Sequence, residues 1–348
     1  MRGNIRAGRF VTTAVLVAAL GVLDLPGPIG PAAAQAPRLE PLKFTFLFRP
    51  TGSFASFIVS QDRGFFREQG LDVSFIVPGS PGDALKLIAS GETHMGLAHS
   101  TDTILARSRG VPVVSVATNH QFGMAGVLAP IENNIRTPKD LEGKTVGITG
   151  IPANRVMFEE FLKINKVDAT KVQTIVVGFG GLPALLEGRT QAMGDAITFS
   201  EPIGLNLARG KDPNDRSTYS YMAFYKHGLP RYYTFGIITS EQFLAGNPKL
   251  VRQFLRGWEK GLEWSLKNPE EAVDVFLKRY PSVKRPQALG AWKAIMEIST
   301  SDDTKAHGLG WQDVKVWEKQ AQFLLENKLI KSPVDVSKAV TNEFLTNR

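Results

Sequence analysis

Cysteine is absent from the 348 residues of this chain. Its absence excludes disulfides, a thiolate nucleophile, zinc-thiolate and iron-sulfur sites, and a lipid-modified cysteine. The chain also lacks long runs of like charge. Its 41 Lys and Arg against 33 Asp and Glu give a net charge of +8. This spread-out basic excess is typical of a solvated surface, and we expect no nucleic-acid partner. The 43% of hydrophobic residues suffices for the cores of about two domains.

The first 36 residues have the order of a secretory signal. Arg2, Arg6 and Arg9 precede an apolar run at residues 10–23, and an alanine-rich stretch follows at residues 32–36. The apolar run is shorter than the ~20 residues that a membrane-spanning helix needs. We therefore expect residues 1–36 to be a cleaved signal peptide and the mature chain to reside in the periplasm.

The mature chain alternates short apolar, β-branched runs with longer helical patterns. The runs predict strands at residues 44–48, 73–77, 113–117, 145–148 and 172–177. Helix signals stand between them: Ser80-Pro81 opens one helix and Gly91 closes it. After residue 240 the pattern is helical only. The sequence thus predicts an α/β fold with a helical carboxyl-terminal part.

One internal echo indicates two lobes of similar build. LKLIASGETHMG at residues 85–96 is similar to LLEGRTQAMG at residues 185–194, each with a helix end, a turn and a Met-Gly strand. Two related lobes, about one hundred residues apart, produce such a repeat.

Motifs for catalysis are missing from the sequence. We find no Walker loop, nucleophile elbow, zinc-protease motif or kinase motif. The five histidines include no pair spaced to assemble a metal site on one helix. We therefore expect no enzyme activity, no catalytic residue, no cofactor and no metal.

Small polar residues instead gather at the predicted ends of strands and starts of helices. In open α/β sheets these positions face a crevice, where backbone amides and hydroxyl groups bind ligands. Capping of the helix is the alternative role for each of them. The positions are Thr51, Ser53, Ser80, Ser100, Thr101, Thr149 and Ser200, the last followed by Glu201.

Several motifs in order resemble one family. GFFREQGLDV at 64–73, GETHMG at 91–96 and TPKDLEGKTVG at 137–147 are similar to solute-binding proteins of ABC importers. The group includes binders of thiamine pyrimidines, alkanesulfonates, nitrate and taurine. The resemblance extends from about residue 42 to residue 330, and residues 232–241 and 268–272 are most similar to the pyrimidine-precursor branch.

The resemblance implies a two-lobed periplasmic binding protein of type II. Each lobe is a mixed sheet flanked by helices, and the ligand cleft lies between the lobes. Residues 37–123 and 241–348 would form lobe 1, and residues 124–240 lobe 2. The protein would be a monomer that closes on a small molecule and delivers it to an inner-membrane ABC transporter permease.

The same resemblance suggests the ligand. The branch carries Asn-Thr-Asn-His where this chain has Thr51 to Phe54, so an aromatic ring replaces the histidine. Glu201 would accept hydrogen bonds from an exocyclic amine, or serve only the start of its helix. Fungal relatives that synthesise the pyrimidine have a cysteine-rich cluster that residues 149–154 lack. The expected ligand-binding residues are Arg49, Thr51, Ser53, Phe54, Ser80, Ser100, Thr101, Asn119, Gln121, Thr149, Asn154, Phe199, Glu201, Tyr232 and Tyr233.

Three hypotheses about function remain open from the sequence. The leading one is a binder of a small nitrogen heteroaromatic such as a thiamine pyrimidine precursor, because Phe54, Tyr232 and Tyr233 offer flat faces. The second is a binder of an organic anion, an alkanesulfonate or aromatic carboxylate, held by Arg49 unless this side chain belongs to the rim. The third is a pyrimidine-processing enzyme with Glu201 or His120 as acid or base.

Overall fold

The computed structural model describes residues 38–178 and 181–346. The predicted signal peptide at residues 1–36 lies outside them. Leu39–Arg348 form one compact unit. Over the described ranges, no helix combines the length and the apolar character that crossing a bilayer requires.

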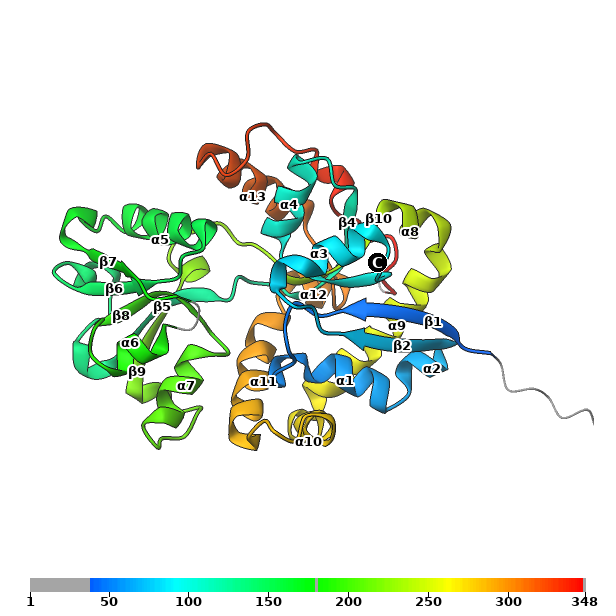
Figure 1. Cartoon of the computed structure of the whole chain (residues 1–348), viewed down its shortest axis with the longest axis horizontal. Coiled ribbons are helices and arrows are strands. Elements are labelled where there is room, and N and C mark those ends of the chain that lie inside the picture. The colour runs from blue at the N-terminus through cyan, green and yellow to red at the C-terminus, as the bar shows by residue number, and fades with distance from the viewer. Residues whose placement is uncertain (1–37, 179–180, 347–348) are drawn as a thin grey trace, which may run out of the picture. The chain divides into compact units, whose positions relative to one another are not determined.

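The first of two sheets has five strands in the order β2-β1-β3-β10-β4 (Figure 1). Strand β1 pairs in parallel with both β2 and β3, whereas β10 pairs antiparallel with β3 and β4. The strands are β1 (Glu40–Thr45), β2 (Leu71–Ile76), β3 (Met95–Ala98), β4 (Val113–His120) and β10 (Thr234–Ser240).

The second sheet repeats this plan in the order β7-β6-β8-β5-β9. Strand β6 pairs in parallel with β7 and β8, and β5 pairs antiparallel with β8 and β9. The strands are β5 (Ala125–Pro130), β6 (Thr145–Ile148), β7 (Gln173–Val176), β8 (Ala192–Ile197) and β9 (Tyr219–Ala223). The expected fold class, two mixed sheets flanked by helices, is confirmed.

The internal echo has a structural counterpart in each sheet. Residues 85–96 run from helix α3 (Pro81–Ser90) into β3, and residues 185–194 run from helix α6 (Leu182–Leu186) into β8. Strands β3 and β8 each lie third in their sheet, between a parallel and an antiparallel neighbour. Gly91 ends α3 with a left-handed φ of 78°, as the sequence predicted.

Apolar side chains pack on both faces of the first sheet. One face bears the largest core, which includes Phe44, Phe254 and Trp258. The helices of this side are α1 (Ala55–Asp62), α2 (Phe65–Glu68), α9 (Pro248–Lys267), α10 (Pro269–Arg279) and α11 (Arg285–Ser299). On the other face, Ala98 of β3 and Ile238 of β10 pack with Ile88 of α3 and with Ala106 of α4 (Ser100–Ser108).

Helices α1 and α9 approach closely at a glycine. A Cβ at Gly261 would overlap the side chain of Ser60 and would lie 3.0 Å from the carbonyl oxygen of Ser56. The missing side chain therefore permits this contact between the two helices.

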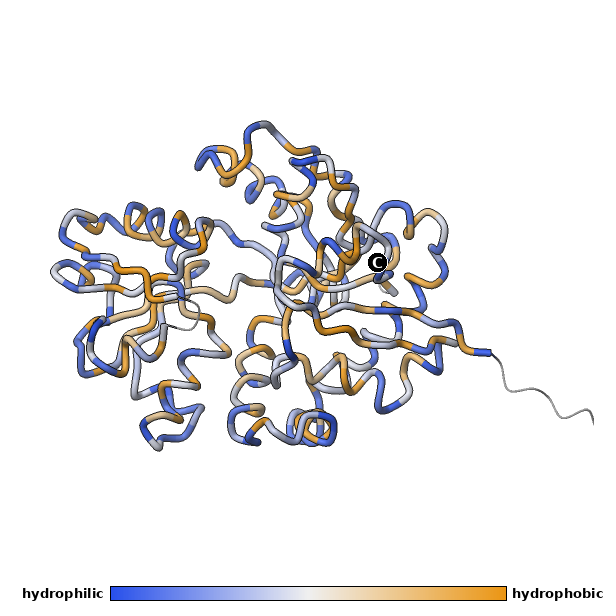
Figure 2. Tube along the Cα trace, viewed as in Figure 1, coloured by the Kyte–Doolittle hydropathy of each residue, from blue (hydrophilic) through white to orange (hydrophobic). Residues whose placement is uncertain are grey.

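The second sheet is also covered on both faces. Helix α5 (Pro152–Ile164) contributes Phe158 and Phe161 to one core, and α6 and α7 (Glu201–Ala208) border another through Leu185 and Leu205. In Figure 2 the apolar stretches of the tube follow the strands of both sheets.

The carboxyl-terminal part is helical, as predicted. It consists of α8 (Glu241–Gly246), α9 to α11, α12 (Asp302–His307) and α13 (Val314–Glu326). Its tryptophans 258, 292 and 317 are buried core residues. Val340 forms an isolated parallel bridge with Ser115 of β4, which ties the end of the chain to the first sheet.

All five predicted strands exist, but their limits differ from the prediction. The first begins at Glu40 rather than residue 44 and ends at Thr45. Strand β10 hydrogen-bonds within the first sheet. The predicted lobe boundaries, 37–123, 124–240 and 241–348, stay a prediction, and we propose moving the return into lobe 1 from residue 240 to before Thr234.

Candidate functional site

A cavity of about 530 Å³ is lined by residues from both sheets and their helices. The first sheet's side contributes Phe48, His99 and one face each of α3 and α4. The second sheet's side contributes Met157 of α5 together with Asp195 and Ile197 of β8. Pockets of this size accommodate small organic ligands, so this cavity is the candidate binding site.

One buried carboxylate faces this cavity. Asp195 is 3% exposed and accepts hydrogen bonds from the Thr149 amide (3.1 Å), the Thr149 hydroxyl and the Asn154 side-chain amide (3.0 Å). Among the described residues no lysine or arginine pairs with it. The three donors fix the carboxylate in place, and they leave acceptor capacity for a ligand that donates hydrogen bonds.

An aromatic cluster lies on the other side of the cavity, around Phe235 of β10. The Phe235 ring stacks on Phe54 at 5.1 Å and on His99 at 5.7 Å, and it meets His120 at 4.5 Å. Phe48 and Phe199 approach it edge-on, each at 5.9 Å. Phe48 and His99 also line the cavity, so part of this cluster is open to a ligand.

The backbone of Phe235 has φ of 52°. A bulky residue rarely adopts this left-handed conformation, and the strain persists only where the surrounding packing holds it. Here the packing of five rings holds it. The Phe235 amide also donates to Nδ1 of His99 at 3.5 Å, which favours the tautomer with its proton on Nε2.

Burial keeps two histidines of this cluster neutral. It lowers the pKa of His120 well below its ordinary value, with the neighbouring His99 adding to the effect. Burial also lowers the pKa of His99, against the opposing charge of Asp102. This aromatic cluster, which forms one wall of the cavity, is therefore uncharged at neutral pH.

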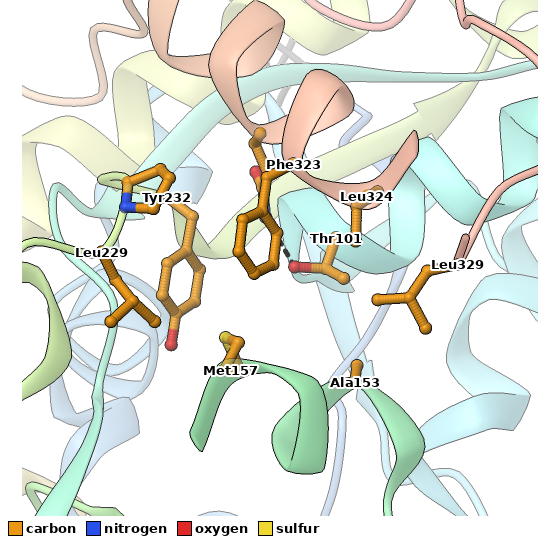
Figure 3. Close-up of a pocket in the computed structure, with 10 residues that line it drawn as sticks. Thr101, Ala153, Met157, Leu229, Tyr232, Phe323, Leu324 and Leu329 are labelled. Atoms are coloured by element: carbon orange, nitrogen blue, oxygen red, sulfur yellow. Dashed lines mark hydrogen bonds between the residues drawn. The ribbon is translucent and has the colours of Figure 1, made fainter. Parts of the chain in front are cut away.

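A smaller hollow of about 20 Å³ shares Thr101, Ala153, Met157 and Tyr232 with the cavity. Figure 3 shows the residues that line it. Met157 and Ala153 of α5 face Phe323 of α13 there, and the Tyr232 ring stands at one side. Gln320 of α13 donates to the Thr101 hydroxyl at 2.6 Å. The hollow has room for about one water molecule, so α13 closes this end of the site.

Of the predicted ligand-binding residues, Thr101, Asn154 and Tyr232 line the cavity. Thr149 lies directly behind them as a donor to Asp195. Tyr232 packs its ring where a Cβ on Gly123 would stand, and burial raises its pKa to about 12. The structure therefore brings these four residues together.

The structure places most of the other predicted residues in supporting contacts. The Ser100 hydroxyl donates to the Tyr233 carbonyl at 2.9 Å, and the Tyr233 hydroxyl accepts from the Asp313 amide at 2.7 Å. Gln121 accepts from Arg231 at 2.6 Å. Asn119 is fully buried, and its side-chain nitrogen and oxygen have no hydrogen-bond partner among the described residues.

The remaining predicted residues also lie outside the lining of the cavity. Thr51 and Ser53 bond each other at 2.8 Å, and the exposed Ser80 bonds Asp83 at 2.7 Å instead of capping α3. Phe54 and Phe199 reach the cavity only through the aromatic cluster.

Two charged residues central to the sequence hypotheses lie apart from the cavity lining. Arg49 is exposed and donates to Ser282 at 3.2 Å. Glu201 is 8% exposed and accepts from the Ile197 amide at 2.7 Å, and burial raises its pKa. Glu201 thus serves the junction between β8 and α7 in this structure.

Asp195, His99 and Arg109 line the cavity but were missed by sequence reasoning. The signal for Asp195 was a lone carboxylate in the apolar strand AMGDAI, because such a charge is rarely buried without a specific role. Within residues 38–178 and 181–346 no group of three His, Asp or Glu is arranged to hold a metal ion.

Comparison with known proteins identifies a family whose model matches this chain. The family model described as NMT1/THI5 like matches residues 51–272. The chain is 29% identical to the formylaminopyrimidine-binding protein of Halalkalibacterium halodurans, over 87% of this chain and 90% of that protein. It is 28% identical to the riboflavin-binding protein RibY of Chloroflexus aurantiacus, over 97% of each chain.

Solved structures share the fold at lower identity. The periplasmic aliphatic sulphonate binding protein SsuA from Escherichia coli superposes with a TM-score of 0.67 at 13% identity, covering 86% of this chain and 96% of that one. This likeness agrees with the two sheets described above.

Proposed function

The chain belongs to the NMT1/THI5-like family, and on this premise we propose that it is the substrate-binding component of an ABC importer. It captures a nitrogen heteroaromatic, such as a thiamine pyrimidine precursor, between its two lobes. The formylaminopyrimidine-binding relative supports this ligand class. The protein works in the periplasm as a monomer and delivers its ligand to an inner-membrane permease.

The buried Asp195 supports the heteroaromatic ligand most directly. An exocyclic amine or a ring N–H would donate to its carboxylate, which Thr149 and Asn154 hold in position. A flat ring would at the same time contact the neutral aromatic wall formed by Phe48 and His99. We therefore assign recognition of the amine to Asp195 in place of Glu201.

Lobe closure would complete the site. The cavity takes its lining from α3 and α4 on one side and from α5 on the other. A ligand that touches both sides favours the closed arrangement by its contacts, and the closed form is what a transporter would recognise.

Arg109 supports a second candidate ligand, an organic anion. Arg109 is among the residues that line the cavity, whereas Arg49 is not. An alkanesulfonate or aromatic carboxylate would pair with Arg109.

Binding of an unmodified ligand separates this proposal from a pyrimidine-processing enzyme. We would incubate purified protein with 4-amino-5-hydroxymethyl-2-methylpyrimidine, follow the thermal shift, and recover the compound for mass spectrometry. A ligand at 100 times its Kd adds about 2.7 kcal/mol of stability. Recovery of the intact compound with a shift is expected, a shift only with sulfonates would favour the anion, and conversion of the compound would refute the binding role.

A further inference from the structure

The cavity extends along two helices of the first sheet, beyond the region of Asp195. Helix α3 lines it with Gly82, Leu85, Lys86 and Ala89, which lie on one helical face at spacings of three and four. Helix α4 lines it with Thr101, Asp102, Leu105, Ala106 and the following residue Arg109. Because each residue advances a helix by about 1.5 Å, Thr101 to Arg109 span about 12 Å. A single ring does not fill this length.

The walls of this extension are largely apolar, with Lys86 and Asp102 as charged members of the lining. Leu85 and Leu105 supply branched side chains, while Ala89 and Ala106 leave space between the helices, and Val111 follows α4. We name the extension formed by these five residues the α3–α4 trench. Binding of an apolar ligand group to this surface is favourable because it removes apolar area from water.

A cation stands at the end of the trench. Arg109 is exposed, and among the described residues its side chain has neither an ion pair nor a hydrogen bond. Lys86, by contrast, pairs with Asp83 at 2.9 Å. Arg109 is therefore the cation that remains open to an anionic group of a ligand in the trench. The carboxylate of Asp102 also lines the cavity, seven residues or about 10 Å along the helix from Arg109, so the anion would have to lie at the Arg109 end.

We propose that the α3–α4 trench is a subsite for an apolar extension of the ligand that ends in an acid. The ligand class is an amphipathic compound with a hydrogen-bond-donating ring at Asp195, an alkyl or aryl body in the trench and a carboxylate or similar anion at Arg109. This assignment rests on the proposed function of the same cavity. It also unites the two ligand candidates, because one molecule carries both the ring and the anion.

A homologous series tests the trench. The probes are 2-methyl-4-aminopyrimidines with ω-carboxyalkyl chains of one to seven methylenes at ring position 5, measured by isothermal titration calorimetry beside the hydroxymethyl parent. We expect Kd to fall about fourfold with each methylene that the trench buries, until the chain reaches Arg109. Amide-terminated probes of equal length should bind three- to tenfold more weakly than the acids.

Variants locate the effect. Ala106→Phe fills the trench and should abolish the gain from chain length, so that the chain-bearing probes bind this variant no more tightly than the parent compound binds the same variant. Ala89→Phe, at an exposed position on the opposite helix, provides a second blocking variant if Ala106→Phe lowers the folded yield. Arg109→Gln should remove the difference between acid and amide probes, and Arg67→Gln, an exposed arginine away from the cavity, should keep it.

The outcomes separate the two proposals. If the parent binds and chain length has no effect, the trench subsite is refuted and the proposed function stands. If neither the parent nor any chain-bearing probe binds, the proposed function fails and the subsite fails with it. A chain-length effect that survives both blocking variants also refutes the trench.

Discussion

Replacing Asp195 by asparagine tests how the ring is recognised. The substitution keeps the size of the side chain and removes its negative charge. Asp195 is buried, and among the described residues no cation pairs with it, so a ligand amine would be its one charge-assisted partner from outside the fold. Such a hydrogen bond contributes about 1.5–3 kcal/mol, and Asp195→Asn should raise the Kd of the aminopyrimidine roughly 10- to 150-fold.

The same substitution should also affect folding, by a separate route. The Thr149 amide and hydroxyl and the Asn154 amide all donate toward Asp195. All three donors converge on one carboxylate oxygen, so an asparagine Oδ1 in that position still accepts from them. These hydrogen bonds lose their charge assistance and weaken, which lowers the unfolding free energy by about 1 kcal/mol. Calorimetry must therefore be done well below the lowered Tm, with circular dichroism to confirm that the variant is folded.

Glu201→Gln is the matched control. It removes a second buried carboxylate from the same lobe, but one that lies outside the cavity lining, and a glutamine oxygen still accepts from the Ile197 amide. Its Kd for the aminopyrimidine should stay within twofold of the parent protein. A large loss in Glu201→Gln with no change in Asp195→Asn would refute the assignment and favour Glu201 as the amine acceptor.

Three further predictions concern stability. Gly261→Ala should lower the unfolding free energy by about 1–3 kcal/mol because the new Cβ overlaps Ser60. Gly246→Ala is the control and should not lower it, because the space around its Cβ is open. Equal denaturation midpoints of the two variants would contradict the close contact between the helices. The pKa of His120 is lowered in the fold, so the unfolded chain takes up a proton first as the pH falls below 6.5. The stability present above pH 6.5 is therefore lost on acidification, and the unfolding constant rises up to about tenfold per pH unit. His120→Gln should flatten that slope in urea titrations from pH 7.5 to 5.5, and an unchanged slope would count against a buried neutral His120. Because the pKa of Glu201 is raised in the fold, the folded protein loses stability as the pH rises from about 4.5 through the raised pKa. Glu201→Gln should remove this loss, which Tm scans over pH would show. A Tm difference between the variant and the parent protein that does not vary with pH would refute the prediction.

Local sequence patterns predicted much of the fold because they act through short-range physics. β-branched runs marked β2, β4, β6 and β7, and Ser80-Pro81 and Gly91 marked the two ends of α3. Strands β5 (AGVLAP) and β9 (YSYMA) carry alanine, glycine, serine and proline, so their pairing depends on tertiary neighbours that spacing does not reveal.

The candidate site was less predictable for a physical reason. Small hydroxyl residues at strand ends bond either the backbone or a ligand, and their sequence position is the same in both cases. Ser100 and Ser80 form such internal bonds, whereas Thr101, next in the chain, lines the cavity. Side-chain direction decides the role, and it follows from helix geometry that the sequence alone leaves open.

The central place of β10 in the first sheet has a consequence for how the nascent chain folds. Strand β4 ends at His120 and β10 begins at Thr234, with every strand of the second sheet made in between. Strands β3 and β4 therefore have no bridge until two thirds of the chain exists. We expect the second sheet to form early from contacts closer in sequence, and the first sheet, although it begins the chain, to form last. A ribosome product stopped before Thr234 would expose the facing edges of β3 and β4 to pairing with other chains.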